Sequence, residues 1–91
     1  MPEPLSEWCV YIVRCADGSL YTGVTTDSVR RVIEHNQNDR LGAKYTRARR
    51  PVNLVYQEPC DNRSDACKRE AEIKKLSRQR KITLITAHME K

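Results

Sequence analysis

Residues 9 to 23 read CVYIVRCADGSLYTG, two apolar segments separated by the turn sequence Ala16-Asp17-Gly18. Residues 8 to 15 are rich in β-branched and aromatic side chains and are apolar on both faces, which predicts a central strand. Residues 19 to 25 follow the turn directly, so we expect them to pair with that strand as an antiparallel hairpin. The predicted fold is built outward from this hairpin.

The length of the hairpin loop decides whether two tyrosines, Tyr11 and Tyr21, face the same side of the sheet. A two-residue loop pairs Arg14 with Tyr21 and places the tyrosines on opposite faces, because side chains alternate along a strand. A three-residue loop pairs Val13 with Tyr21 and places both tyrosines on one face. Asp-Gly suits the shorter loop, and Gly18 as a left-handed bulge residue suits the longer one, so local chemistry admits both.

The rest of the chain alternates between helical and extended patterns. After the hairpin we predict a helix, an irregular segment with a short helical turn, a strand and two helices, at 28–37, 36–51, 52–58, 65–76 and 78–87. Short polar side chains that can cap the exposed amides of a first turn precede the three helices: Asp27, Ser64 and Ser77. The predicted order of elements is therefore ββαβαα.

Length and composition limit the class of protein. The 91 residues fit a single domain at 1–91, because a second core would leave each half too small to be stable. No apolar run approaches the roughly 20 residues that cross a bilayer, and the first residues lack the segments of a targeting signal, so a cytoplasmic protein is expected. The four cysteines include no C-x-x-C pair, which argues against structural zinc.

Positive charge is concentrated in one segment, residues 40 to 51, which reads RLGAKYTRARRP and contains no acidic residue. The formal charge of the whole chain is +5, which favours acidic partners such as nucleic acid. We expect contacts to phosphates and not to bases from this segment, because it lacks a helix or ribbon that could enter a groove. The candidates are Lys44, Arg47, Arg49 and Arg50; a loop kept soluble by its charge is the alternative interpretation.

The helix predicted at 28–37 carries two polar side chains beside an apolar stripe. At about 100° per residue, Val29, Val32 and Ile33 form the stripe that we expect to face the core. Arg31 and His35 lie off this stripe and are one turn apart, so they are neighbours on the helix surface. An arginine and a histidine are thereby placed together just after the second strand.

The helix that follows Ser64 has a carboxylate on its apolar face. Ideal helical geometry places Glu70 about 40° from Ala66, inside the stripe that also contains Ile73, whereas Glu72 lies outside the stripe. A carboxylate on a packing face costs free energy unless it is paired, hydrogen-bonded or bound to a metal ion. Glu70 is therefore a candidate for either a salt bridge or a metal ligand.

These residues, in this order, resemble the GIY-YIG nuclease domain. The matching pieces are Val10-Tyr11-Ile12, Tyr21-Thr22-Gly23, Asp27 with Arg30-Arg31, His35-Asn36, and Ala66 to Glu70. Two further stretches, GAKYTRARRPVNLVY and EAEIKKLSR, are similar to the small stand-alone bacterial members of the YhbQ-like, UPF0213 type. The resemblance covers about residues 7 to 86.

The resemblance implies an α+β fold, a small three-stranded antiparallel sheet flanked by helices. It favours the three-residue hairpin loop, because the two tyrosines share a catalytic surface in the family. The site residues that it implies are Tyr11, Tyr21, Arg31, His35 and Glu70. It further implies that Glu70 binds one Mg²⁺ or Mn²⁺ ion, since a carboxylate suits a hard cation that keeps most of its waters.

The sequence departs from the family pattern at three positions. Cys9 stands in place of the first glycine of the motif, Thr22 replaces an isoleucine, and Val24 replaces a lysine found in some members. The first two positions contribute no reactive side chain, so we expect activity to survive them. A mechanism that relies on the lysine does not transfer to this chain.

The expected activity is metal-dependent hydrolysis of DNA phosphodiester bonds with little sequence specificity, in DNA repair or processing, without a small-molecule cofactor. The first alternative is a nucleic-acid-binding module of the same fold with little or no cleavage. A protein-interaction domain with a basic surface is the second. Retention of all five site residue types favours the nuclease, and the sequence leaves the oligomeric state open.

Overall fold

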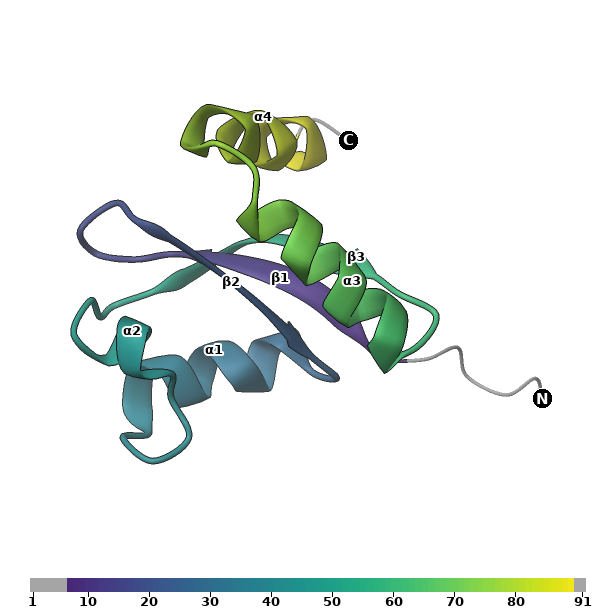
Figure 1. Ribbon diagram of the computed structural model, residues 1–91. Coiled ribbons are helices and arrows are strands. Elements are labelled where there is room, and N and C mark those ends of the chain that lie inside the picture. Colours follow the sequence, from purple (N-terminus) through teal and green to yellow (C-terminus); the bar gives the residue numbers. More distant parts are fainter. Residues whose placement is uncertain (1–6, 90–91) are drawn as a thin grey trace.

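The computed structural model of the chain describes residues 7–89, so positions 1–6 and 90–91 of the expected domain lie outside the described residues. The elements, in chain order, are β1 (Cys9–Arg14), β2 (Leu20–Thr25), α1 (Ser28–Gln37), α2 (Lys44–Arg47), β3 (Asn53–Pro59), α3 (Arg63–Lys74) and α4 (Arg78–Met89). The order ββαβαα is confirmed, with α2 as the helical turn expected in the basic segment (Figure 1).

The three strands form one antiparallel sheet in the order β2-β1-β3, so the first strand is central, as predicted. In the hairpin Val13 pairs with Tyr21, and the amide of Cys15 donates to the carbonyl of Ser19 at 2.9 Å. Gly18 has φ of 84°, the left-handed conformation that closes a three-residue loop. Tyr11 and Tyr21 therefore share a face of the sheet, which confirms the longer loop.

The sheet separates two layers of helices (Figure 1). Helix α1 packs beneath β1 and β3 with α2 beside it, and α3 and α4 cover the opposite face. The core on the α3 and α4 side is built from Val10, Ile12, Tyr56, Ala66, Ile73 and Ile85. The core on the α1 side contains Tyr11, Val13, Cys15 and Val52. Alternate residues of β1 enter opposite cores, as the period of a strand requires.

The apolar stripe predicted for α1 is wrong at two of its three residues, and only Val32 packs against the core. Val29 is 67% exposed and Ile33 is 51% exposed, whereas Ser28 and His35 are buried. The helix is rotated so that a polar face meets the sheet, where the hydroxyl of Ser28 donates to Gln57 Oε1 at 2.7 Å and His35 bonds to Tyr11. Hydrogen bonds with the sheet, and not burial of the most apolar face, fix the orientation of α1.

The start of α3 and the end of β3 also differ from the prediction. Helix α3 is capped by Asn62 and not by Ser64, since the Asn62 side chain accepts from the amide of Asp65 at 2.8 Å. Strand β3 continues to Pro59, which pairs with Cys9 at the end of the ladder, where a missing N–H is tolerated. Among the elements within residues 7–89, no helix is long and apolar enough to cross a membrane.

Candidate active site

A buried hydrogen bond between Tyr11 and His35 lies at the centre of the site. Tyr11 comes from the middle of β1 and is 1% exposed; His35 comes from the last turn of α1 and is fully buried. The hydroxyl of Tyr11 is 2.7 Å from Nε2 of His35. A Cβ atom on Gly23, the partner of Tyr11 in β2, would lie 2.6 Å from that hydroxyl. The glycine thus provides the space that the phenol occupies.

The other ring nitrogen of His35 is held by Thr46 of α2. Nδ1 lies 2.9 Å from the hydroxyl of Thr46, which itself donates to the carbonyl of Ala43 at 2.9 Å. Because the threonine has one proton, it must accept from Nδ1–H in this arrangement. The Ala43 amide also approaches Nδ1, at 3.3 Å, which requires the opposite tautomer. We assign the proton to Nδ1 on the shorter bonds, so that Nε2 accepts from Tyr11.

Burial keeps both members of this pair neutral. Burial, together with the charges of Arg31 and Arg50, lowers the pKa of His35 to about 4, although the charge of Glu34 acts in the opposite direction. Burial also raises the pKa of Tyr11 to about 12, although the Arg31 guanidinium beside the phenol acts in the opposite direction. Near pH 7 the site therefore contains a neutral imidazole that accepts a hydrogen bond from a neutral phenol.

The depressed pKa of His35 predicts a loss of stability in mild acid. The unfolded chain binds a proton on this imidazole below about pH 6.5, whereas the folded chain resists it until about pH 4. The stabilisation of the folded state that comes from His35 is therefore fully present above pH 6.5 and is lost as the pH falls toward 4. We expect the free energy of unfolding in urea to fall by about 2 kcal/mol more between pH 7 and pH 5 in the wild type than in His35→Gln. Equal pH dependence in both proteins would contradict the burial of a neutral His35.

Arg31 lies one turn before His35 and is fixed by contacts on either side. Its guanidinium donates to Glu34 Oε1 at 3.0 Å and to the carbonyl of Leu41. About a quarter of its side chain is exposed, 24%, so part of the guanidinium is accessible next to the buried phenol of Tyr11. The arginine is thereby held in place without being removed from solvent.

Tyr21 completes an aromatic cluster around His35. Its ring centroid is 6.5 Å from that of Tyr11 and 5.4 Å from that of His35, with an edge-on contact to the imidazole. On another side the ring stacks on Tyr45 of α2, with centroids 5.8 Å apart and planes inclined by 24°. The structure therefore brings together both motif tyrosines, Arg31 and His35, as the resemblance implied.

Glu70 lies on α3, which covers the opposite face of the sheet from α1. Burial is the main cause of the raised pKa of Tyr11, and the charge of Glu70 adds a small contribution in the same direction. The Glu70 side chain is 24% exposed and pairs with Lys74 at 3.5 Å, whereas Glu72 is 66% exposed and pairs with Arg69. The prediction from helical geometry is confirmed, since Glu70 is the more buried of the two carboxylates.

The donor set around Glu70 fits a cation that retains its water. Within residues 7–89 no group of three or more histidine, cysteine, aspartate or glutamate side chains is arranged to bind a metal ion. A single partly exposed carboxylate suits Mg²⁺ or Mn²⁺, which are commonly bound through one or two carboxylates together with water and substrate phosphate. The residues present are therefore compatible with one hydrated ion at Glu70.

Most of the basic segment is engaged in contacts within the protein. Arg49 pairs with Asp17 at 3.1 Å and lies over the ring of Tyr45, 3.9 Å from its centroid. Arg50 donates to the carbonyl of His35 at 2.6 Å and pairs with Asp39. The remaining two candidates, Lys44 and Arg47, are exposed, and Arg47 donates to the carbonyl of Asp39 at 2.8 Å.

Three contributors to the site were missed from the sequence. Thr46 is fully buried against His35, and no local signal could have found it, because the contact depends on how α2 packs. Tyr45 could have been noted as an aromatic residue within a basic run. Gly23 belongs to the matched motif, but its role as the space for the phenol of Tyr11 appears only in the structure.

Comparisons with known proteins find a matching family and several relatives of this chain. The family model described as the GIY-YIG catalytic domain matches residues 7–83. A UPF0213 protein of Desulfotalea psychrophila is 61% identical over 80 residues, which are 88% of this chain and 72% of that protein. One from Staphylococcus saprophyticus is 58% identical over 77 residues, 85% and 92% of the two chains.

Two solved structures of similar proteins share the fold. The NMR structure of the UPF0213 protein BH0048 from Bacillus halodurans is 44% identical, with a TM-score of 0.56 over 88% of this chain and 83% of that one. The NMR structure of EF2693 from E. faecalis is also 44% identical, with a TM-score of 0.59 over 100% and 95% of the two chains.

Proposed function

Since the chain belongs to the GIY-YIG catalytic domain family, we propose that it hydrolyses DNA phosphodiester bonds with little sequence specificity, in DNA repair or processing. The observation that carries this proposal is the hydrogen bond of 2.7 Å between the Tyr11 hydroxyl and Nε2 of His35, beside an accessible Arg31. A phenol that donates to a proton acceptor and lies beside a guanidinium can take a proton from a water molecule that attacks a phosphate.

Tyr11 is the residue that takes the proton from the attacking water. A free phenolate is disfavoured, because the pKa of this phenol is raised to about 12. The hydroxyl can accept the water proton while its own proton moves to Nε2 of His35, so no separate phenolate forms. A phosphate next to Arg31 would offset the positive charges that lower the pKa of His35, which makes the imidazole a better acceptor when substrate is bound.

Arg31 binds the reacting phosphate. Its guanidinium is planar and carries several donors, so it can bind phosphate oxygens while one nitrogen keeps its bonds to Glu34 and Leu41. Donors held in place before the reaction stabilise the charge that grows in the transition state without reorganising. Tyr21 lines the same surface and shapes the approach of the substrate.

Glu70 is the residue that would hold one Mg²⁺ or Mn²⁺ ion. When bound, such an ion neutralises phosphate charge and assists the leaving oxygen. Lys74 now pairs with this carboxylate, so the chain already balances the charge of Glu70 with a mobile cation.

The basic segment holds DNA beside the site. Lys44 and Arg47 are exposed on α2 and contact phosphates first. Arg49 reaches phosphates with the nitrogen that Asp17 and the Tyr45 carbonyl leave unpaired. The unpaired nitrogen of Arg50 is buried, so Arg50 supports the segment through its bonds to His35 and Asp39. The phosphate contacts add affinity without reading sequence.

Substitutions of Thr46 test the proposed transfer of a proton from Tyr11 to His35. Thr46→Val keeps the shape of the side chain but removes the acceptor for Nδ1–H, so the imidazole proton is expected to move to Nε2 and to oppose transfer from Tyr11. We expect the ¹⁵N chemical shifts of the two ring nitrogens of His35 to exchange their pattern, and cleavage to slow by about tenfold or more. Thr46→Ser, which keeps the hydroxyl, should restore both. Unchanged shifts in Thr46→Val would contradict the tautomer assigned to His35.

The proposed activity is tested by incubating the purified protein with single-stranded, duplex and branched DNA in Mg²⁺, Mn²⁺ or EDTA. We expect cleavage with either metal ion and none with EDTA. DNA that is bound but left intact under every condition would instead identify a nucleic-acid-binding module of this fold.

A further inference from the structure

A second concentration of positive charge lies where α3 meets α4. The chain from residue 73 to residue 89 contains no acidic residue. Five cations fall within eight of these positions, and we call them the junction surface: Lys74, Lys75, Arg78, Arg80 and Lys81. Four of the five are exposed and Lys81 is half-buried.

The cations of the junction surface have few acidic partners. Elsewhere in the described residues five arginines pair with carboxylates: Arg30 and Arg31 share Glu34, Arg49 pairs with Asp17, Arg50 with Asp39, and Arg69 with Glu58. Within the described part of the chain, residues 7–89, only Lys74 of the junction surface has a salt bridge. The uncompensated charge therefore lies at the junction more than in the segment 40–51.

Two contacts connect the junction surface with the candidate active site and with the basic segment. At one end Lys74 pairs with Glu70. At the other end Arg78 donates to the carbonyl of Gly18 at 3.0 Å, in the hairpin turn whose Asp17 holds Arg49. The junction surface therefore extends from the carboxylate of Glu70 to the hairpin turn.

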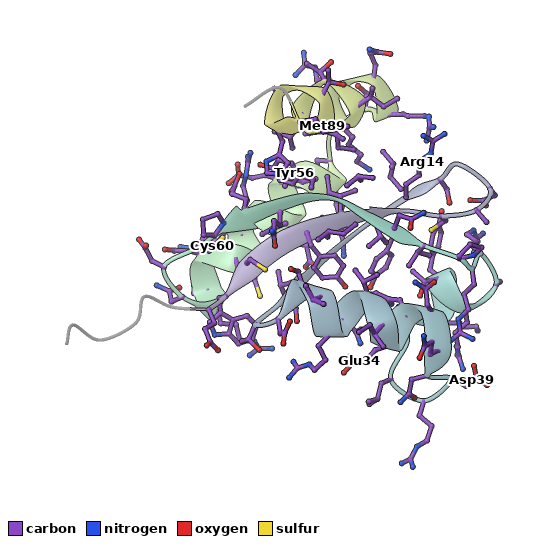
Figure 2. The ribbon with its side chains drawn as sticks, turned by 180° about the vertical axis from the view of Figure 1, so that it is seen from behind. Arg14, Glu34, Asp39, Tyr56, Cys60 and Met89 are labelled. Atoms are coloured by element: carbon purple, nitrogen blue, oxygen red, sulfur yellow. The ribbon has the colours of Figure 1, made fainter. Side chains whose placement is uncertain are left out.

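The figures show the same arrangement. In Figure 1, α4 begins above the turn between β1 and β2, with α2 below that turn. In Figure 2, Arg14 projects from the end of β1 toward α4. Arg14 is exposed and lines the same cavity as Arg78, so it adds a further cation between the turn and the junction surface.

We propose that the junction surface is a second phosphate-contacting surface, which binds the backbone of the DNA on the far side of the scissile bond from α2. This inference rests on the proposed function. Duplex DNA presents one charge for about every 1.7 Å of its axis, so a band of unpaired cations is complementary to it along its whole length. The residues are mostly exposed lysines and arginines at a junction between two helices, which suits backbone contacts and not base readout.

The test compares two double variants that remove the same charge. Lys75→Gln with Arg80→Gln alters the junction surface, and Arg63→Gln with Lys68→Gln, also exposed, alters the N-terminal half of α3. Binding to a short labelled duplex is followed by fluorescence anisotropy in EDTA over a range of salt concentrations. Thermal melting shows that each variant is folded.

We expect the junction variant to bind about tenfold more weakly at low salt and to reduce the slope of log Kd against log salt by about 2, close to one for each phosphate that is no longer neutralised. The control variant should keep the wild-type slope. Equal slopes in the two variants, with DNA bound normally by the wild type, would contradict the proposal that the junction surface contacts phosphates. The proposed function would be unaffected by that result. A wild-type protein that binds no DNA would overturn both.

Discussion

Glu70→Gln is expected to slow DNA cleavage by at least about 100-fold, a rise of roughly 2.7 kcal/mol or more in the barrier. Glutamine keeps the size and helix propensity of the side chain but removes the charge that would hold the cation. The substitution removes the carboxylate that we propose as the metal ligand on α3. Single-turnover cleavage in Mg²⁺ measures the effect.

Glu72→Gln is the matched control, two residues away on the same helix. Its side chain is 66% exposed and pairs with Arg69, outside the site. We expect a change in cleavage of less than about threefold, because substitutions at exposed positions away from such a site have small effects. If Glu72→Gln proved damaging while Glu70→Gln cleaved normally, both the alignment of α3 and the metal assignment would be wrong.

Tyr11→Phe is also expected to slow cleavage by about 100-fold or more, because it removes the hydroxyl through which the water proton would reach His35. The ring keeps its place in the core beside Val13 and Val52, so the variant should fold. Nε2 of His35 loses its partner, which costs about 1–3 kcal/mol of stability. Cleavage is compared with DNA binding in EDTA, which should change by less than about threefold.

Tyr56→Phe provides the control for removal of a buried tyrosine hydroxyl. Tyr56 lies in β3 on the other face of the sheet, is 6% exposed, and donates to Glu58 at 2.7 Å. Its substitution should lower stability by a similar amount and leave cleavage within about threefold of the wild type. Similar losses of cleavage in the two variants would show that Tyr11 acts only through the stability of the fold.

The hairpin could be predicted from the sequence because its signals are local. The β-branched and aromatic residues of β1 predict a strand, Gly18 predicts a left-handed turn residue, and the pairing of Val13 with Tyr21 follows from the three-residue loop. Local chemistry admitted a second register, and the resemblance was needed to choose between them. The order of elements followed from similar local patterns.

The two helices that carry site residues differ in how well a helical wheel predicts the buried face. In α3 the apolar face and the buried face coincide, so the position of Glu70 followed from the positions of Ala66 and Ile73. In α1 they do not coincide, because the bond of His35 to Tyr11 rotates a polar face inward and leaves Ile33 exposed. A helical wheel contains no information about a hydrogen-bond partner on another element.

The charge distribution shows a second limit. The run from Arg40 to Arg50 is unopposed in the sequence, but the fold brings Asp17 and Asp39 to Arg49 and Arg50. Charge balance depends on contacts between residues far apart in the chain, so counting charges within a segment overestimates what is free to bind phosphate.

The single-turnover cleavage rate of one DNA substrate, at saturating protein in Mg²⁺, tests most directly whether four residues form one hydrolytic site: Tyr11, His35, Arg31 and Glu70. The wild type is measured beside Tyr11→Phe and Glu70→Gln proteins that bind the same DNA equally well in EDTA. We predict cleavage by the wild type and rates lower by about 100-fold or more in both variants. A wild type that binds without cutting, or variants that cut at the wild-type rate, would contradict the account.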